Sequence, residues 1–407
     1  MHQFLLTFAL SALGSIILAT GLASLAGRLG FPLPGDTGRL GAVDGLRGYL
    51  ALSVMLHHFY IWIQSTRLGG TWGGPEIPVF NQLGAGGVAL FFMATGLVFY
   101  PRILAGLRST SWSAVYISRI FRIMPLVTIS VSIVTAIILL RTGASMDLSY
   151  IGAAARWIST WAEVPILGYP DSGRINAYVL WSLKYEWIFY ILILPLSAAG
   201  MDAVRSRGWP AWILPAALFT LALGIRLTVW LAGISFDFLR YLPLFAVGML
   251  AFECQSRPRW REALAKPWIG AVAIGALVAG AVTTQFPYGA SLPLFSFFFV
   301  CVACGNSLFG LLRSRGARVL GECSFGIYLL HGIVLDVAFV DGGAFVQTLP
   351  TAALPLLLFG AVAVIVPLTA MTYLLIERPM IGLGKAAAWW LAGRRNQLDR
   401  RQLEIAP

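Results

Sequence analysis

The sequence predicts an all-α integral membrane protein with about eleven transmembrane helices. Of the 407 residues, 58% are hydrophobic and only 11% are charged, and the mean hydropathy is +0.80. Soluble domains are about half apolar and about a quarter charged. Lipid must therefore solvate most of the surface, because there are too few polar side chains to cover a water-soluble core of this size.

The candidate spans are runs of about 18 to 25 apolar residues, which is the length that crosses a bilayer. About eleven occur, at residues 4–26, 43–63, 84–101, 123–140, 178–198, 211–232, 239–253, 268–285, 291–312, 323–340 and 351–376. The first run is predicted to be an uncleaved helix rather than a signal peptide. No Lys or Arg precedes it, and it is long for the core of a signal peptide.

The positions of the basic residues predict the orientation, because cytoplasmic loops of membrane proteins are rich in Lys and Arg. Most of the 29 lysines and arginines lie in alternate connections, starting with the one after the first span, and in the C-terminal tail. The other connections hold Arg67, Arg141, Arg156 and Arg174. The N-terminus is therefore expected outside and the C-terminus in the cytoplasm, with residues 141–177 forming a folded outside cap.

The net charge of +12 does not indicate nucleic-acid binding, because the chain has no basic stripe interleaved with exposed aromatic residues. Cys301 and Cys304 form a C-x-x-C pair, but the pair lies inside an apolar run without polar neighbours. They are expected to be small buried residues, and no metal site is predicted. No pattern in the sequence specifies an oligomeric state.

Ionisable residues inside membrane helices are costly, so each one is a functional hypothesis. Arg47 and His58 in the second span are eleven residues apart and share one helix face. His58 would lie about 16 Å deeper than Arg47, near the middle of the membrane. Asp44 falls on nearly the same face, whereas His57 points about 80° away. A lone membrane histidine is usually structural, but one in line with an arginine is a candidate catalytic residue.

Arg119 and Arg122 stand at the expected cytoplasmic start of the fourth span. Residues three apart on a helix face the same way, and paired guanidinium groups suit phosphate oxygens. The alternative is an ordinary positive anchor at the cytoplasmic surface, which this motif by itself favours.

Two further ionisable residues are expected at similar depths. Glu186 would lie about 12 Å below the outer surface, and His331 about 12 Å from the cytoplasmic side. Together with His58 they would form an acid–base site, although depth alone does not place them side by side. The alternative for Glu186 is an ion pair with Arg226 or Arg240 in another helix.

These motifs together resemble the acyltransferase-3 family of membrane proteins, whose members O-acetylate bacterial surface glycans. The matching stretches, in family order, are residues 43–58 with Arg-x10-His, residues 87–97, residues 119–125, residues 181–186, residues 324–331 and residues 377–379. In the second stretch, Thr95 and Leu97 replace the family's Ser and Phe. The main departure is the extra helix before Val43.

The resemblance implies a ten-helix core preceded by one extra helix. Residues 1–40 would form the extra transmembrane helix and a cytoplasmic linker, residues 41–380 the acyltransferase-3 membrane domain, and residues 381–407 a basic cytoplasmic tail. It also implies the bacterial cytoplasmic (inner) membrane. There the chain would contact the lipid bilayer, an acyl-CoA donor, with acetyl-CoA as the family's usual one, and a glycan or other hydroxyl acceptor.

The family's residue roles carry over onto the matching positions. Arg119, Arg122 and Arg47 would bind the phosphates of acyl-CoA. His58 would act as the general base or carry the acyl group itself, with Glu186 or Asp44 orienting the imidazole. The acceptor would enter past a group of four residues, which are Trp181, Ser182, Tyr328 and His331.

Two other functions fit the composition. A secondary transporter also places ionisable residues at mid-depth, although two matching halves with broken helices are not evident. A partner of polysaccharide export without chemistry of its own is the other alternative.

Overall fold

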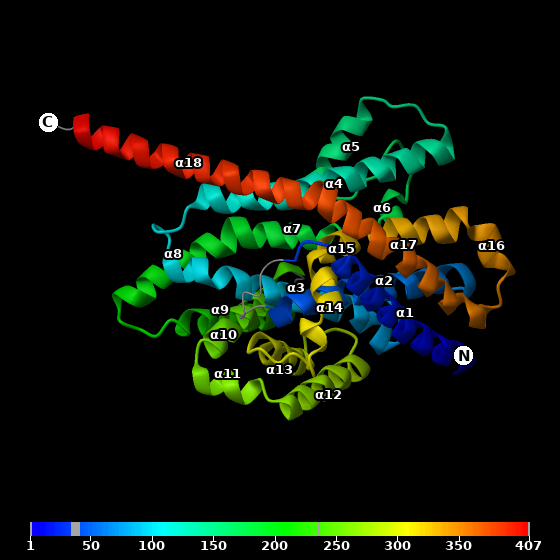
Figure 1. Cartoon of the computed structure of the whole chain (residues 1–407), viewed down its shortest axis with the longest axis horizontal. Coiled ribbons are helices and arrows are strands. Elements are labelled where there is room, and N and C mark those ends of the chain that lie inside the picture. The colour runs from blue at the N-terminus through cyan, green and yellow to red at the C-terminus, as the bar shows by residue number, and fades with distance from the viewer. Residues whose placement is uncertain (1, 34–40, 234–236, 406–407) are drawn as a thin grey trace.

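The computed structural model describes residues 2–33, 41–233 and 237–405 of the chain (Figure 1). Most of these residues are in helices, and none of them forms a β-strand. The prediction of an all-α membrane protein is confirmed. Among the described residues, seven helices are long and apolar enough to cross a membrane, or eight if the bent pair of α11 and α12 counts as one span. The count of about eleven spans stays a prediction.

The larger helices follow the predicted runs. They are α1 (His2–Arg28), α2 (Gly41–Arg67), α3 (Pro78–Ala105), α4 (Trp112–Thr142), α7 (Trp181–Ile188), α8 (Leu194–Ser206), α9 (Ile213–Leu231), α10 (Leu242–Gln255), α12 (Pro267–Thr283), α13 (Leu292–Ala303), α15 (Ser324–Asp336), α17 (Leu357–Thr372) and α18 (Arg378–Ile405). Five short α-helices lie in the connections: α5 (Ser149–Ile158), α6 (Ser172–Ile175), α11 (Pro258–Leu264), α14 (Arg315–Glu322) and α16 (Gly343–Thr348).

Six short segments have other helical geometries. Three are 3-10 turns, η2 (Asp237–Arg240), η3 (Leu311–Arg313) and η5 (Thr351–Leu356). Three are π-helical, η1 (Phe189–Ile193), η4 (Val337–Asp341) and η6 (Tyr373–Glu377). Each π-helical segment follows a longer helix directly, so that α7, η1 and α8 run on as one span.

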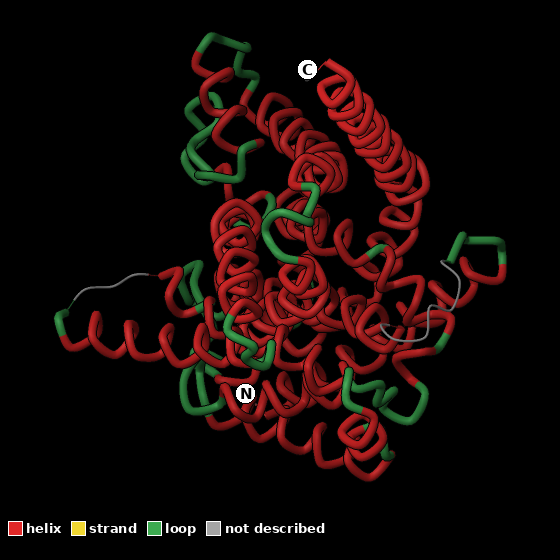
Figure 2. The backbone as a smooth tube through the Cα atoms, turned by 90° about the vertical axis from the view of Figure 1, so that its left-hand side faces the viewer, coloured by secondary structure: helices red, strands yellow, loops and turns green. Residues whose placement is uncertain are grey.

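Helices α2 and α3 form the centre of the bundle. Helix α2 packs against α3, α14 and α15, and α3 packs against α10. In Figure 2 many of the helices are seen nearly end-on and stand side by side. A Cβ atom on Gly96 of α3 would overlap the carbonyl oxygen of Phe245, and one on Gly248 of α10 would overlap that of Met93. The two backbones therefore touch, as small residues at membrane-helix interfaces allow.

Helix α4 begins at Trp112, about three turns before the predicted start at residue 123. The prediction that Arg119 and Arg122 stand at the start of this helix is therefore wrong, because they lie well inside it. The last predicted span also extends further than residue 376, since α18 continues to Ile405 and projects beyond the bundle (Figure 1).

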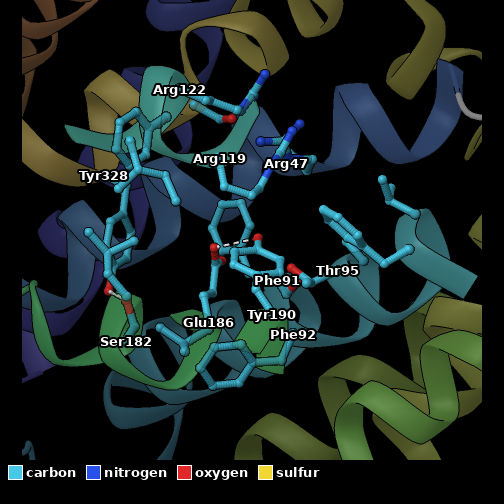
Figure 3. A pocket seen from close by; sticks show the side chains of 18 of the residues that line it. Arg47, Phe91, Phe92, Thr95, Arg119, Arg122, Ser182, Glu186, Tyr190 and Tyr328 are labelled. Atoms are coloured by element: carbon cyan, nitrogen blue, oxygen red, sulfur yellow. Dashed lines mark hydrogen bonds between the residues drawn. The ribbon is translucent and has the colours of Figure 1, made fainter. Parts of the chain in front are cut away.

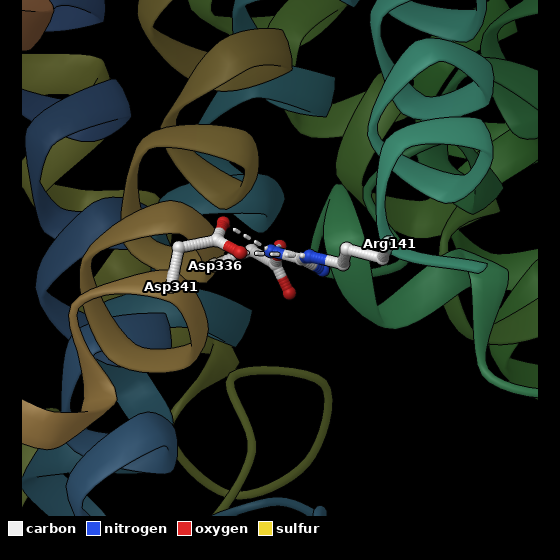
Figure 4. A network of polar contacts seen from close by, with 3 residues as sticks. All are labelled: Arg141, Asp336 and Asp341. Carbon is white, nitrogen blue, oxygen red and sulfur yellow. Dashed lines mark hydrogen bonds and ion pairs between the residues drawn. The ribbon is translucent and has the colours of Figure 1, made fainter. Parts of the chain in front are cut away.

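An ion-pair network joins the C-terminal ends of α4 and α15 (Figure 4). The guanidinium of Arg141 lies 2.5 Å from Asp336 and 2.6 Å from Asp341. The side chain of Asp336 is only 3% exposed, so this pair is largely shielded from solvent. The network fixes α4, which carries Arg119 and Arg122, against α15, which carries Tyr328 and His331.

The connection from residue 143 to residue 180 contains α5 and α6 and ends where α7 begins. Within it, Glu163 accepts a hydrogen bond of 2.7 Å from the backbone N–H of Leu180. Its other carboxylate oxygen is buried and has no hydrogen-bond partner among the residues that the structure describes. Burial raises the pKa of Glu163 to about 8, because the single bond from Leu180 offsets only part of the cost of removing the charge from water.

Glu163→Gln is expected to flatten the pH dependence of stability. Between pH 4.5 and about pH 8, folded Glu163 keeps a proton that the unfolded chain has lost, so stability falls as pH rises through this window. The slope is at most about 1.4 kcal/mol per pH unit, and it levels off above the folded pKa. Apparent melting temperatures of the purified protein across this range measure it. The exposed Glu76 supplies the control, since Glu76→Gln should leave the wild-type slope in place.

Candidate active site

A cavity of about 270 Å³ lies between α2, α3, α4, α7 and α15 (Figure 3). Its floor and sides are mostly apolar and aromatic, and come largely from α3. The ionisable residues on its wall are Asp44, Arg47, Arg119, Arg122, Glu186, Tyr190 and Tyr328. Six residues predicted for the site from three motifs therefore meet in one cavity: Asp44, Arg47, Arg119, Arg122, Ser182 and Glu186. Tyr328, from a fourth motif, lines it as well.

The three arginines gather on one side of the cavity, which we call the arginine end (Figure 3). In the described part of the chain, none of them forms an ion pair with a carboxylate. The guanidinium of Arg119 lies over the rings of Phe99 and Tyr190, at 5.1 and 5.9 Å from their centroids. Its Nε is buried and has no hydrogen-bond partner among the described residues. The arginine end thus has guanidinium groups held ready for an anion.

Glu186 does not pair with Arg226 or Arg240, so that alternative is wrong. Its carboxylate accepts a hydrogen bond of 2.9 Å from the hydroxyl of Tyr190, one turn further along the same span. Arg240 pairs instead with Asp237, and Arg226 donates to the carbonyl oxygen of Tyr288. The π-helical segment η1 includes Tyr190, and such segments often occur at functional sites.

Ser182 and Tyr328 close the cavity away from the arginines. Their hydroxyl groups are 2.8 Å apart, and the Tyr328 hydroxyl also donates to the carbonyl oxygen of Val179 at 3.2 Å. Both side chains are buried. Trp181 points elsewhere: it is 37% exposed, does not line the cavity, and packs against Tyr241 with ring centroids 5.6 Å apart.

Two histidines, His331 and His58, lie behind Tyr328. The ring centroid of Tyr328 is 6.3 Å from that of His331, and Nε2 of His331 is 2.9 Å from Nδ1 of His58. His331 is fully buried, whereas His58 is only partly buried. Sequence reasoning placed the two histidines at similar depths. It could not place them in contact, because that depends on how α2 and α15 are rotated against each other.

The hydrogen-bond partners define the tautomers of the two rings. Nδ1 of His331 is 2.9 Å from the carbonyl oxygen of Ile327, which can only accept, so this nitrogen carries the proton. In the neutral ring, Nε2 of His331 is then an acceptor for the Nδ1–H of His58. Nδ1 of His58 also lies 3.1 Å from the carbonyl oxygen of Val54. His58 therefore presents an unprotonated Nε2, the form that a base or nucleophile requires.

His331 is thus the side chain that orients His58, and the expectation that Glu186 or Asp44 does so is wrong. Both carboxylates line the cavity, which neither histidine does, and Glu186 accepts its hydrogen bond from Tyr190. The neighbouring His57 has a different place. Its Nδ1 is 2.8 Å from the carbonyl oxygen of Phe80, and its ring packs on Gly84, so it joins α2 to α3.

Comparison with known proteins gives one match. A family model described as an acyltransferase domain matches residues 40–370. No curated protein sequence and no solved structure matches the chain significantly.

Proposed function

The chain belongs to the acyltransferase-3 family, and we propose that it takes an acyl group from acyl-CoA in the cytoplasm and transfers it to a hydroxyl group outside. The donor is acetyl-CoA, and the acceptor is a glycan or a related hydroxyl compound. The protein acts in the bacterial cytoplasmic (inner) membrane. Its N-terminus is outside and its C-terminus is in the cytoplasm, as the distribution of basic residues favours.

The observation that carries this proposal is the alignment of three features. A cavity has, at one end, guanidinium groups that form no ion pair within the described ranges, and at the other a pair of buried hydroxyl groups. Next to Tyr328 stands His331, which in turn contacts His58, and the bonds of this pair leave Nε2 of His58 unprotonated. Acyl transfer needs a binding site for the anionic donor, a place where the transfer occurs, and a base. The guanidinium groups, the hydroxyl groups and the histidine can fill these three roles in that order.

The donor enters from the arginine end. Arg119, Arg122 and Arg47 bind its phosphates, since guanidinium groups make paired, charge-assisted bonds to phosphate oxygens. The cavity of about 270 Å³ is smaller than sites that enclose a whole drug-sized ligand. Only the narrow pantetheine arm therefore fits inside, and the nucleotide stays at the mouth. The thioester then reaches Ser182 and Tyr328.

The transfer itself uses Nε2 of His58. In a direct route, Nε2 takes the proton of the acceptor hydroxyl, the oxygen attacks the thioester carbonyl, the C–S bond breaks and the proton passes to the CoA thiolate. In a two-step route, Nε2 attacks the thioester carbonyl, the C–S bond breaks and CoA leaves as the thiolate. The acceptor oxygen then attacks the acyl-imidazole, the bond to Nε2 breaks and the acceptor's proton passes to the thiolate. The hydroxyl groups of Ser182 and Tyr328 supply hydrogen-bond donors for the developing oxyanion.

His331 is a positioning residue in this scheme, and His331→Phe should lower kcat by up to about a hundredfold while leaving the KM for acyl-CoA near the wild-type value. Phenylalanine fills the space but removes the acceptor that holds the His58 tautomer. His331→Gln retains a carbonyl oxygen that can accept from Nδ1 of His58, so it should restore part of kcat. Equal loss in both variants, or a change confined to KM, would contradict the positioning role.

Membrane vesicles of defined sidedness test the proposal. Inverted vesicles that contain the protein should release CoA from added acetyl-CoA, because their cytoplasmic face is outside. Sealed right-side-out vesicles should not do so until they are permeabilised. Release that is independent of sidedness would reject the cytoplasmic donor site, and no release from either preparation with any short acyl-CoA would reject the enzyme.

A further inference from the structure

A second, larger cavity of about 770 Å³ lies outside the candidate active site, between α9, α10 and α13. Its wall is almost entirely apolar, with Leu223 and Leu227 from α9, Val247 and Leu250 from α10, and Val300 from α13. Leu227 and Trp230 are 56% and 72% exposed, so the α9 side of this groove faces the surroundings of the bundle. In a membrane those surroundings are lipid, and a hydrocarbon chain can occupy the groove from the bilayer.

One charged residue, Arg226, lines this groove. It lies five residues before the end of α9, about 8 Å along the helix. Its guanidinium donates to the carbonyl oxygen of Tyr288 in the loop at that end of the groove. Among the described residues no carboxylate pairs with it. An arginine within a membrane helix is costly unless an anion or water compensates its charge.

The position of Arg226 distinguishes it from an ordinary surface anchor. The positive-inside rule places anchoring arginines at the cytoplasmic end of a span, and α9 reaches the opposite side where Arg226 stands. A free anchor also extends toward water, whereas the bond to Tyr288 holds this guanidinium at the mouth of the groove. A phosphate group at the outer end of a hydrocarbon chain matches both the charge and the groove.

A series of aromatic rings leads from Arg226 to the candidate active site. Tyr288 contacts Tyr241 with ring centroids 5.3 Å apart. Tyr241 contacts Trp181 at 5.6 Å and Phe92 at 5.3 Å. Phe92 lines the first cavity, and Trp181 is adjacent to Ser182. Tyr288 and Tyr241 are only 7% and 6% exposed, whereas Trp181 is 37% exposed. Trp181 therefore offers the accessible aromatic face of this series, and such faces suit the flat, partly apolar faces of sugar rings.

We infer that the groove between α9, α10 and α13 binds a phosphate-linked lipid carrier, with its hydrocarbon chain in the groove and its phosphate on Arg226. The saccharide on this carrier lies outside the packed rings of Tyr288 and Tyr241, against the exposed part of Trp181, and presents a hydroxyl group toward Ser182. The acceptor is therefore a lipid-linked saccharide rather than a free or fully assembled one. This inference rests on the proposed function and specifies its acceptor.

The binding test uses purified protein in phosphatidylcholine nanodiscs, with native mass spectrometry as the readout. The probes are polyprenyl phosphate, the matching polyprenol and phosphatidylglycerol. Wild type should prefer polyprenyl phosphate to polyprenol, and Arg226→Gln should weaken its binding about tenfold or more. Arg156→Gln, an exposed arginine of α5, is the matched control and should bind as wild type does. Equal binding of phosphatidylglycerol would mean a structural lipid and would overturn the inference.

A second variant controls for the case in which Arg226→Gln loses binding because it folds incorrectly. Ser296→Trp fills the groove from α13 while leaving Arg226 in place, and it should also lose polyprenyl phosphate. Binding that persists in Ser296→Trp would place the lipid elsewhere and overturn the inference.

The acceptor role is tested with membranes of the expressing cell and radiolabelled acetyl-CoA. Wild type should place label in the fraction that organic solvent extracts, about tenfold above Arg226→Gln. Label found only in water-soluble or polymeric glycan would overturn the inference and leave the proposed function intact. If wild type binds polyprenyl phosphate but neither binds nor cleaves acetyl-CoA, the proposed function fails while the lipid site remains.

Discussion

His58→Ala is expected to reduce acyl transfer by about a hundred- to ten-thousandfold, the usual range for loss of a positioned acid–base group. Nε2 of His58 is the nitrogen that the bonds through His331 and Ile327 leave unprotonated. Alanine removes it without touching the arginine end, so acetyl-CoA should still bind. CoA release by the purified protein gives the rate, and equilibrium binding of acetyl-CoA gives the donor affinity.

The adjacent histidine provides a matched control for this result. His57 bonds to Phe80 and packs between α2 and α3, so His57→Gln should keep the transfer rate within a few-fold of wild type. If His58→Ala transfers as fast as wild type, both routes through Nε2 are excluded. If His57→Gln is as inactive as His58→Ala, the loss reflects the fold of α2 rather than the chemistry of His58.

Arg119→Gln is expected to raise the dissociation constant of acetyl-CoA by about ten- to a hundredfold, since one charge-assisted hydrogen bond contributes about 1.5–3 kcal/mol. The guanidinium has no carboxylate partner in the described part of the chain, so its removal leaves no buried carboxylate unpaired. The rate at saturating donor should change much less than the affinity. Binding isotherms at low and high salt measure the effect, which should shrink as salt screens the phosphates.

Arg108→Gln controls for the general positive charge at this side of the bundle. Arg108 is exposed and lies in the loop before α4, outside the cavity. It should bind acetyl-CoA nearly as wild type does. Equal weakening in Arg108→Gln and Arg119→Gln would mean that a diffuse field attracts the donor, and unchanged binding in Arg119→Gln would remove the cavity from the donor path.

Hydropathy predicted the bounds of the helices well where the side chains face lipid. It predicted them less well where the side chains face other parts of the protein. The start of α4 illustrates the difference. Residues 112–122 include Arg119 and Arg122, and this polarity placed the predicted boundary at residue 123. The segment is nevertheless helical from Trp112, because it packs against α18 and carries the wall of the cavity. Burial inside the protein tolerates charge that a lipid-facing helix does not.

The candidate site was partly predictable for a similar reason. Helix periodicity placed Arg47 and His58 on one face, and the motifs selected most residues of the cavity. The contact between His58 and His331 required the tilt and rotation of two helices, which packing determines and a single sequence does not reveal. The lipid-facing groove was missed. Its one signal was Arg226, an arginine in an apolar run, which sequence reasoning treated only as a partner for Glu186.

Binding and turnover of acetyl-CoA by the purified wild-type protein test the central claim most directly. The proposed arginine end and histidine pair predict saturable donor binding and slow release of CoA even without an acceptor, because water can take the place of the hydroxyl group. If the folded protein neither binds nor cleaves any short acyl-CoA, the cavity is not a donor site and the proposed mechanism is wrong.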